Sequence, residues 1–501
     1  MEIRKKHTDD PDKLEHLRRM KMAELIGRKN EIKEFMHIYN SSKAEFVVVY
    51  GRRRVGKTFI VNHLYSSQMC FYHTGLSPIE KENNTKKQLQ NFAFSLASYG
   101  LKIDSTPENW LEAFELLKQL IASKTVAKGR RRIIFIDEMP WLDTPKSGFI
   151  TGFEHFWNGW AANQSDIMLI VCGSATSWIS DNLVNNHGGL YNRVTREINL
   201  KPFSLSECRE YYKKHNINFD RYDQIQSYMI LGGIPYYLDM LSPEKSLAQN
   251  IDNLFFKKNA KLRLEYDRLF SSVFVNSDTY KKVVGVLKEK RIGFTRKEIS
   301  QKTSIPYGGG LSKMLNVLEA NNLIISYIPF GMTKKDTMYK LIDPYCLFYN
   351  FFASETKNEN FFSDNVNTTK LNAWRGYAFE DFCFSQTEKI KNALGISAVQ
   401  TSIAPFIKKG DSEDDGAQID MVIDRADRVI HLCEIKFYTD DFTLTKSYLK
   451  ELRHKITVLS ETVQKRLKFA PNIRLTLITT FGLKKNEYSG NFQNVVTIED
   501  L

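Results

Sequence analysis

The chain has 501 residues, which is too long for one hydrophobic core and is typical of about three domains. Its formal net charge of +13 favours a polyanionic partner such as DNA, although a mildly basic protein without such a partner fits this charge equally well. The six cysteines form no CxxC pair, no apolar run approaches a bilayer-spanning length and the first twenty residues are densely charged, so we expect a reduced, cytoplasmic protein.

After a charged segment (1–22), residues 23–202 alternate short apolar runs with helical stretches. This alternation is typical of an α/β domain in which helices connect the strands of a parallel sheet. Several of the runs are almost continuously apolar, as expected of strands that are covered on both faces. The expected strands are 46–50, 69–73, 132–137, 167–173 and 196–200.

The stretch "YGRRRVGKT" (50–58) lies between an expected strand and an expected helix and fits the pattern G-x-x-x-x-G-K-[ST]. Its glycines let backbone N–H groups approach phosphates, Lys57 is expected to bridge the β- and γ-phosphates, and Thr58 is expected to bind Mg²⁺. The motif does not require its three arginines, and we expect at least one to contact a phosphate or an acidic loop. The residues expected to contact the nucleotide here are Gly51, Arg52, Arg53, Arg54, Val55, Gly56, Lys57, Thr58 and Phe59.

A second expected strand, "IIFID", ends in Asp137 and is followed by Glu138. We expect Asp137 to hold the magnesium ion and Glu138 to polarise the attacking water. A chance combination of a glycine turn and an acidic strand end is the alternative interpretation.

These two motifs resemble those of the AAA+ superfamily of P-loop ATPases. The resemblance implies ATP and Mg²⁺ as cofactors, an adenine contact near residues 25–35, a sensor role for Ser174 and an arginine finger at Arg193. Asn192 replaces the glycine that related proteins carry before this arginine, and Arg196 is the competing candidate. "GGIP" (232–235) resembles a motif of the STAND-like subgroup, in which Pro235 helps to close a lid over the base. An arginine finger that acts in trans also implies a homo-oligomer.

Residues 203–272 are expected to form a helical lid, and residues 273–345 a winged helix-turn-helix, because three helices precede a β-wing. The helix expected to enter a DNA groove carries few base-reading side chains, which favours non-specific binding to phosphates. A winged helix that only packs against its own protein is the alternative. The cations expected to contact DNA are Arg296, Lys297, Lys302, Lys313, Lys334 and Lys335.

Residues 346–501 follow the order αβββαβ, with a polar linker or mobile loop expected at 355–369 and an acidic loop at 411–415. If a hairpin turn is centred on residue 427, Asp420 lies directly across from Glu434, and Lys436 shares the face of Glu434. Two adjacent carboxylates repel each other, so we expect Mg²⁺ or Mn²⁺ between them, with Lys436 activating water. A solvated hairpin with a cross-strand salt bridge is the alternative. The acidic loop is expected to be solvated, rather than to block this site or to bind a second metal.

This hairpin resembles the PD-(D/E)XK nucleases of restriction-endonuclease-like fold, although Ile419 replaces the proline of that motif. The resemblance implies that Glu380, on the preceding helix, is a third metal ligand. Almost the whole chain resembles a prokaryotic family called archaeal-type ATPases, which join an AAA+ module to a winged helix and a domain of this nuclease fold. We therefore expect a magnesium-dependent ATPase that binds and cuts DNA. The alternatives are an ATP-switched DNA-binding regulator or scaffold with an inactive nuclease-like domain, and a signal-transducing ATPase that never meets DNA.

Overall fold

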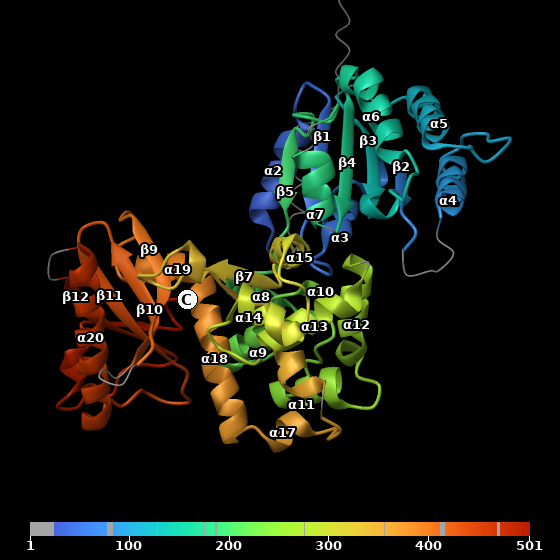
Figure 1. Ribbon diagram of the computed structural model, residues 1–501. Helices are drawn as coiled ribbons and strands as arrows, with labels where there is room; N and C mark the ends of the chain where they lie inside the picture. Colours follow the sequence, from blue (N-terminus) through green and yellow to red (C-terminus); the bar gives the residue numbers. More distant parts are fainter. Residues whose placement is uncertain are drawn as a thin grey trace, which may run out of the picture. The chain divides into compact units, whose positions relative to one another are not determined.

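The structure is a computed structural model that describes residues 25–77, 84–127, 129–174, 176–185, 188–274, 276–354, 356–410, 416–467 and 471–501 (Figure 1). The charged segment 1–22 and the acidic loop 411–415 lie outside these residues. The chain divides into two compact units. The first comprises the residues up to Tyr211 together with Ile234–Asp239 and Asp267–Ser277, and the second comprises Tyr212–Gly233, Met240–Tyr266 and Asp278–Leu501. The residues predicted to form the lid are therefore divided between the two units.

The first unit is built on a five-stranded sheet of order β2-β3-β4-β1-β5, in which every neighbouring pair is parallel. The strands lie within one residue of the predicted runs. Strand β1 sits between β4 and β5, so the carboxyl ends of β1, β3 and β4 meet at one edge of the sheet. The strands are β1 (Glu45–Tyr50), β2 (Met69–Thr74), β3 (Arg132–Asp137), β4 (Ile167–Gly173) and β5 (Arg196–Asn199).

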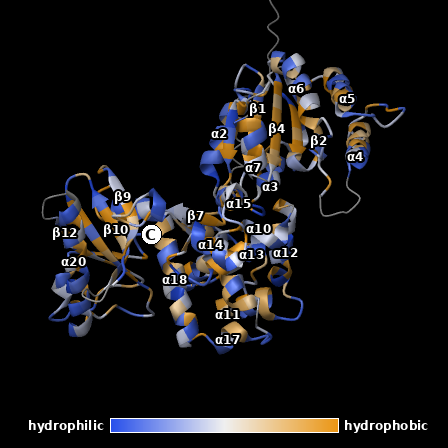
Figure 2. Ribbon diagram, viewed as in Figure 1, coloured by the Kyte–Doolittle hydropathy of each residue, from blue (hydrophilic) through white to orange (hydrophobic). Residues whose placement is uncertain are grey.

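Helices cover the sheet of the first unit because its strands are apolar on both faces. Every residue of β4 is buried, and Figure 2 shows this strand as largely hydrophobic. Trp110, Phe114 and Phe153 are members of the cluster that packs against the strands. The helices of this unit are α2 (Lys29–Tyr39), α3 (Lys57–Tyr65), α4 (Thr85–Ser98), α5 (Trp110–Ser123), α6 (Phe149–Gly159), α7 (Thr176–Ile179), α8 (Leu205–Lys214), α10 (Pro235–Leu238) and α12 (Lys261–Val273), with α8 and α12 each continuing a few residues into the second unit.

The middle of the second unit contains several helices and a small antiparallel sheet of order β6-β8-β7. The helices α13, α14 and α15 and the β7–β8 pair lie where the sequence predicts three helices and a β-wing. The elements of this part are α9 (Arg221–Leu231), α11 (Leu247–Ile251), α13 (Ser277–Leu287), β6 (Phe294–Thr295), α14 (Arg296–Thr303), α15 (Gly309–Ala320), β7 (Ile324–Tyr327), β8 (Met338–Leu341) and α16 (Pro344–Phe348).

The carboxyl-terminal part of the second unit holds a five-stranded mixed sheet of order β13-β12-β11-β10-β9. Strands β9, β10 and β11 are antiparallel neighbours, whereas β12 and β13 run parallel to β11. Strand β13 was not predicted. The elements are α17 (Phe361–Asp364), α18 (Thr369–Ser385), α19 (Thr387–Ala393), β9 (Thr401–Lys408), β10 (Ala417–Arg425), β11 (Val429–Lys436), α20 (Lys446–Leu467), β12 (Asn472–Thr479) and β13 (Asn494–Thr497).

The segment predicted as a linker or mobile loop is instead packed against the second unit. It contains α17, whose Phe362 is buried, and the carboxylate of Asp252 accepts hydrogen bonds from the backbone N–H groups of Phe362 and Ser363. The described residues of this segment are therefore part of the packed second unit, anchored by Phe362 and by Asp252. In the described ranges, no helix combines the length and the apolar character needed to span a bilayer.

Candidate active site

The loop between β1 and α3 turns sharply at two glycines. Gly51 has φ 139°, and a Cβ atom there would lie 2.3 Å from the carbonyl oxygen of Leu200. Gly56 has φ 94° and precedes the first residue of α3. A side chain at either position would be strained, and the glycine at position 51 lets the loop backbone lie close to Leu200, directly after β5.

Lys57 is buried at the start of α3 and connects this loop to β4. Its Nζ donates hydrogen bonds to the carbonyl oxygens of Gly51 and Arg52, at 3.0 and 3.2 Å, and to Ser174 Oγ at 3.0 Å. Burial lowers the pKa of Lys57, while the nearby Glu138 carboxylate opposes that effect. The Lys57 ammonium group is therefore poorly solvated, and a bound polyanion would be attracted to it strongly.

Thr58 and Asp137 meet at the same edge of the sheet. The Thr58 hydroxyl donates to Asp137 Oδ2 at 2.7 Å, and the Cys172 thiol donates to Asp137 Oδ1 at 2.5 Å. A hydroxyl and a carboxylate oxygen at this spacing are suitable ligands for Mg²⁺. The structure thus brings together the two segments that the sequence motifs assign to one magnesium ion.

Glu138 follows β3 with φ 45°, a conformation that turns its side chain toward β4. Ser174 donates to this carboxylate twice, from its backbone N–H at 3.1 Å and from Oγ at 2.9 Å. Burial raises the pKa of Glu138, although Lys57 acts in the opposite direction. Lys57, Ser174 and Glu138 therefore form one connected network.

The three arginines of the loop contact the first unit itself. The guanidinium of Arg54 lies 4.1 Å from the centre of the Tyr236 ring, and that of Arg52 lies 5.5 Å from the Tyr237 ring. Arg53 donates to the carbonyl oxygen of Arg268 in α12 at 3.0 Å. Pro235 is the first residue of the short helix α10 that carries both tyrosines, and Phe59 is exposed at the start of α3.

Arg28 supports the loop and was not selected from the sequence. This buried guanidinium donates to the carbonyl oxygen of Val55 at 2.9 Å and to that of Lys201 at 2.6 Å, while Glu207 accepts from its backbone N–H. It lies in the stretch "LIGRKNEIKEF" (25–35), which was expected only to lie near the adenine, and nothing in that stretch singles out this arginine.

Arg193 and Arg196 differ in their surroundings. Arg193 is exposed and follows Asn192, whose φ of 54° is the left-handed conformation that a glycine would adopt easily and that asparagine tolerates. Arg196 instead pairs with Glu34, with 3.1 Å between Nε and Oε1. Arg193 therefore remains the candidate finger, whereas Arg196 is an ion-paired residue of the surface strand.

The hairpin of β10 and β11 has the predicted register. Met421 pairs with Cys433, so the next position in this register sets Asp420 opposite Glu434. Both carboxylates are buried, and Lys436 Nζ lies 3.6 Å from Asp420 Oδ2 and 3.1 Å from Glu434 Oε2. Burial alone would raise the pKa of Asp420, but the charges of Lys436 and Arg291 outweigh it, and the pKa is lowered.

Two cations that were not predicted, Arg291 and Lys455, also contact the predicted metal ligands. Besides Lys436, Lys455 of α20 lies 2.5 Å from Glu434 Oε1, and the Tyr448 hydroxyl donates to Glu434 Oε2 at 2.5 Å. Arg291 contacts both Asp420 and the third predicted ligand, Glu380.

The fit of a metal to this cluster can be tested on its donor set. Asp420, Glu434 and Glu380 are oxygen donors of the kind that Mg²⁺ and Mn²⁺ prefer. Across the described ranges, however, no group of three or more His, Cys, Asp or Glu side chains is arranged to hold a metal ion. The residues as arranged therefore do not fit the predicted metal, because the cations of the chain already compensate the acids.

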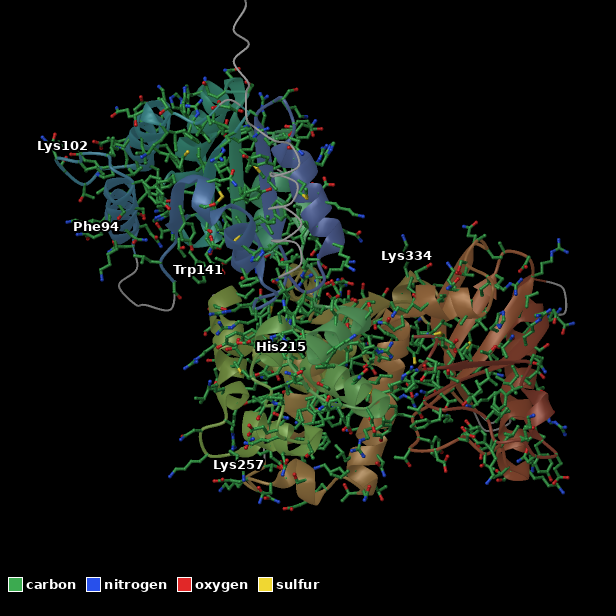
Figure 3. The ribbon with its side chains drawn as sticks, turned by 180° about the vertical axis from the view of Figure 1, so that it is seen from behind. Phe94, Lys102, Trp141, His215, Lys257 and Lys334 are labelled. Carbon is green, nitrogen blue, oxygen red and sulfur yellow. The ribbon has the colours of Figure 1, made fainter. Side chains whose placement is uncertain are left out.

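The cations predicted to contact DNA fall into two groups. Arg296 donates to Ser312 Oγ and to the Tyr307 hydroxyl, and Lys302 pairs with Glu289 at 2.6 Å, so both make contacts within their own module. The side chains of the second group are exposed; Figure 3 shows one of them, Lys334, extending from the surface. This group is Lys297, Lys313, Lys334 and Lys335.

Comparisons with known proteins identify part of the chain. Residues 25–241 match a family model described as an ATPase domain predominantly from Archaea. The uncharacterized protein MJECL04 of Methanocaldococcus jannaschii is 25% identical over 259 residues, which are 52% of this chain and 53% of that relative. The chain thus spans about half the length of this relative.

Solved structures that align with this chain include a Walker-type ATPase of Pyrococcus abyssi and the ORC2 protein of Aeropyrum pernix. The first has a TM-score of 0.46 and 17% identity over 65% of this chain and 96% of its own. The second has a TM-score of 0.41 and 12% identity over 69% of this chain and 96% of its own. The family match gives the firmer conclusion: residues 25–241 form an ATPase domain.

Proposed function

We propose that this ATP hydrolase depends on Mg²⁺ and binds DNA through the second unit, and that cutting of DNA by the carboxylates of β10 and β11 would require displacement of the cations that compensate them. The observation that carries the ATPase part is the network that joins Lys57, Thr58, Asp137, Glu138 and Ser174 at one edge of the sheet. These five side chains come from two strand ends and one helix start, and they supply the charges and hydrogen-bonding groups that phosphate hydrolysis needs.

Thr58 and Asp137 would hold the magnesium ion, and Lys57 would bind the phosphates together with the N–H groups of the loop. When bound, the ion neutralises charge on the phosphates. Lys57 adds a fixed positive charge in a buried site, where water screens it little. Arg193 would act on the nucleotide of a neighbouring copy, which requires at least transient homo-oligomers.

Glu138 would orient a water molecule and take its proton. Burial makes this carboxylate a better base than an exposed glutamate, because its pKa is raised. Ser174 holds both carboxylate oxygens by hydrogen bonds, so the base has a fixed direction.

Two substitutions test this assignment with separable readouts. Lys57→Ala is expected to lose nucleotide binding, and Glu138→Gln to keep nucleotide binding while losing hydrolysis, each lowering turnover by about 100-fold or more. Lys118→Ala, at an exposed lysine of α5, is the matched control. Phosphate release and binding of a fluorescent ATP analogue are measured, and a Glu138→Gln protein that hydrolyses at the unmodified rate would refute the assignment.

The proposal of DNA binding rests on exposed lysines next to the small sheet. Lys334 and Lys335 lie in the β7–β8 connection and point to solvent, where phosphates can reach them. Reversing both to glutamate is expected to weaken duplex binding and to reduce the slope of log affinity against log salt by about two. The exposed pair Lys484–Lys485 of the same unit provides the control, since its reversal removes the same charge elsewhere.

One observation favours the alternative function, an ATP-switched DNA-binding regulator. Arg291, Lys436 and Lys455 compensate the acids that a nuclease would use for metal. Nicking of plasmid DNA with Mn²⁺, with and without ATP, distinguishes the two functions. Activity that disappears in Asp420→Asn, in a protein whose ATP hydrolysis is intact, supports cutting; absence of nicking under all these conditions supports the regulator.

A further inference from the structure

The carboxylates predicted to bind metal in the second unit already hold a cation, the guanidinium of Arg291. We propose that Arg291 is a built-in counter-cation that occupies the divalent-metal position between Glu380 and Asp420, so that metal binding requires it to leave. This inference concerns the same acid cluster as the proposed nuclease function and rests on that function only for the use of the cluster.

The contacts of Arg291 are those of a buried ion pair. Its Nε donates to Glu380 Oε2 at 2.5 Å, and its second terminal nitrogen lies 2.7 Å from Asp420 Oδ1. The side chains of Glu380 and Asp420 are only 9% and 6% exposed. The Tyr377 ring lies 5.3 Å from the guanidinium carbon and adds a cation–π contact. Two carboxylates that would otherwise repel are thereby held together.

The charges around the cluster balance. Glu380, Asp420 and Glu434 contribute three negative charges, and three cations contact them. These negative and positive charges cancel, so the cluster does not attract a divalent cation while the three cations of the chain remain in place. Lys436 and Lys455 pair with Glu434, whereas Arg291 alone bridges Glu380 and Asp420. Lys436 also lies 3.6 Å from Asp420, so removing Arg291 leaves Glu380 without the cation that it contacts and Asp420 with Lys436, and creates net negative charge at the position that a metal would take. The three cations are Arg291, Lys436 and Lys455.

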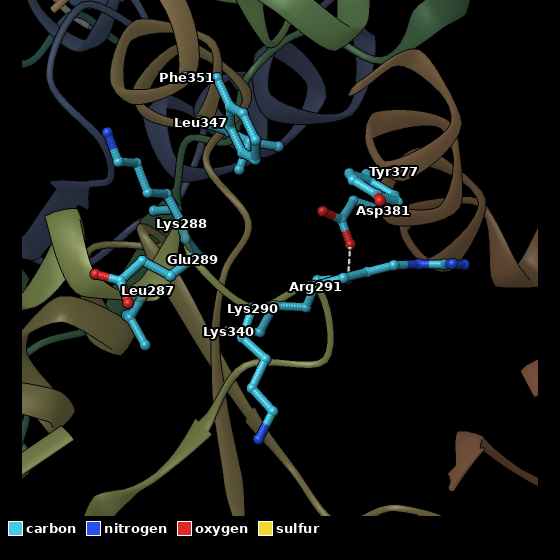
Figure 4. Close-up of a pocket in the computed structure, with 11 residues that line it drawn as sticks. Leu287, Lys288, Glu289, Lys290, Arg291, Lys340, Leu347, Phe351, Tyr377 and Asp381 are labelled. Atoms are coloured by element: carbon cyan, nitrogen blue, oxygen red, sulfur yellow. Dashed lines mark ion pairs between the residues drawn. The ribbon is translucent and has the colours of Figure 1, made fainter. Parts of the chain in front are cut away.

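Arg291 is carried by a different segment of the chain from the two acids that it bridges. It lies in the connection between α13 and β6, whereas Glu380 is on α18 and Asp420 is on β10. The connection lines a cavity of about 150 Å³ together with Leu347, Phe351 and Tyr377 (Figure 4). Figure 4 shows the Arg291 side chain passing Tyr377 and extending away from the other residues of the cavity. The cavity leaves space beside the connection, so a shift of this segment can withdraw the guanidinium.

Other contacts connect the small-sheet module, which comprises α13 to β8 and includes Arg291, to the carboxyl-terminal part of the second unit. Lys340 of β8 pairs with Asp381, the neighbour of Glu380, and the backbone N–H of Phe330 donates to the carbonyl oxygen of Pro405 in β9 at 2.9 Å. The Phe330 ring is buried in the core beneath the mixed sheet. The position of Arg291 is therefore set by the docking of the module that carries the exposed lysines, which links the acid cluster to that module.

Direct binding of Mn²⁺ to the full-length chain tests the proposal without any assay of activity. Nucleotide-free protein is titrated with Mn²⁺ and free metal is followed by electron paramagnetic resonance, with all variants carrying the same first unit so that its contribution cancels. Arg291→Gln is expected to bind one additional Mn²⁺ roughly tenfold or more tightly than the unmodified chain. Arg291→Lys retains the charge and is expected to bind like the unmodified chain, provided that circular dichroism shows both proteins folded.

Two further variants locate the effect. Arg425→Gln removes an equal charge from the same hairpin, where Arg425 pairs with Asp427, and it is expected to gain nothing. Asp420→Asn combined with Arg291→Gln is expected to lose the additional ion. A gain shared by Arg425→Gln, a gain that survives Asp420→Asn, or equal affinities of Arg291→Gln and the unmodified chain would each overturn the proposal.

A parallel nicking assay separates this proposal from the nuclease function. If Arg291→Gln gains the ion but no variant cuts DNA, the counter-cation stands and the nuclease function fails. If the unmodified chain and Arg291→Gln bind Mn²⁺ equally and cut at the same rate, the counter-cation fails and the nuclease function stands.

Discussion

The two units both hold carboxylates in a network of side chains beside a sheet, yet the charges of these carboxylates are compensated in opposite ways. In the first unit, Glu138 faces a single lysine and its pKa is raised by burial. In the second unit, Asp420 lies among cations, and its pKa is lowered because Lys436 and Arg291 outweigh burial. At the first site, a carboxylate whose charge is disfavoured by burial remains available as a base. At the second site, lysine and arginine side chains of the same chain neutralise the carboxylates.

The comparison shows that a short acidic motif does not determine the electrostatics of its site. The cations that decide the outcome come from segments far apart in the sequence, such as Arg291 and Lys455. A site with an uncompensated acid should gain stability when the acid is neutralised, and a compensated site should lose stability. The first and third of the next experiments test this contrast, and the second measures the cost of burying a charge in the first unit.

The largest effect is expected from Glu434→Gln in the second unit. This side chain is fully buried, and its removal leaves Lys436 and Lys455 close together without their common partner, which should cost about 3 kcal/mol of unfolding free energy. Differential scanning calorimetry measures the loss. Glu451→Gln on the exposed face of α20 is the control and should be nearly neutral; equal effects of the two would show that the cluster is not compensated.

An intermediate effect is expected from a buried histidine of the first unit. Burial lowers the pKa of His73 on β2 from 6.5 to about 3, so between these values the unfolded chain binds more protons than the folded chain. Stability therefore falls as the pH falls below 6.5, by about 2 kcal/mol between pH 7 and pH 5.

The variant His73→Phe should lose this part of the pH dependence, because phenylalanine cannot titrate and packs beside Phe71 and Phe92. Thermal midpoints at the two pH values, followed by tryptophan fluorescence, provide the measurement, since five of the six tryptophans lie in the first unit. His155→Gln at an exposed position should keep the full dependence. An unchanged dependence in His73→Phe would assign it to other groups.

The smallest effect, and the opposite sign, is expected from Glu138→Gln. Neutralising this acid removes a charge that burial disfavours, so the first unit should gain about 1 kcal/mol while hydrolysis is lost. Tryptophan fluorescence during thermal unfolding reports the gain, and Glu115→Gln at an exposed surface pair is the control. A lower midpoint in Glu138→Gln would mean that attraction to Lys57 exceeds the cost of burial and would remove the contrast between the units.

Local features of the fold could be predicted from the sequence. The strands of the first sheet were apolar runs with clear ends, and the opposition of Asp420 and Glu434 followed from the length of one hairpin. The strand order β2-β3-β4-β1-β5 could not be predicted, because it depends on pairings between distant segments. Arg291 was missed for the same reason: it lies in the charged run "KEKRIGF", 129 residues before Asp420, and nothing local distinguishes it from its neighbours.

Two tyrosines of α10, Tyr236 and Tyr237, pack against arginines of the loop between β1 and α3 and so connect this loop to a segment far along the chain. Arg54 adopts φ 73°, and its guanidinium packs on the Tyr236 ring, so this ring contacts the loop at a position where the backbone turns. A displacement of α10 by a few ångströms would break this contact and loosen the backbone between Gly51 and Gly56. The contacts between the two rings and two guanidinium groups would thus hold the loop around a bound nucleotide, and a force that pulls α10 away would speed product release.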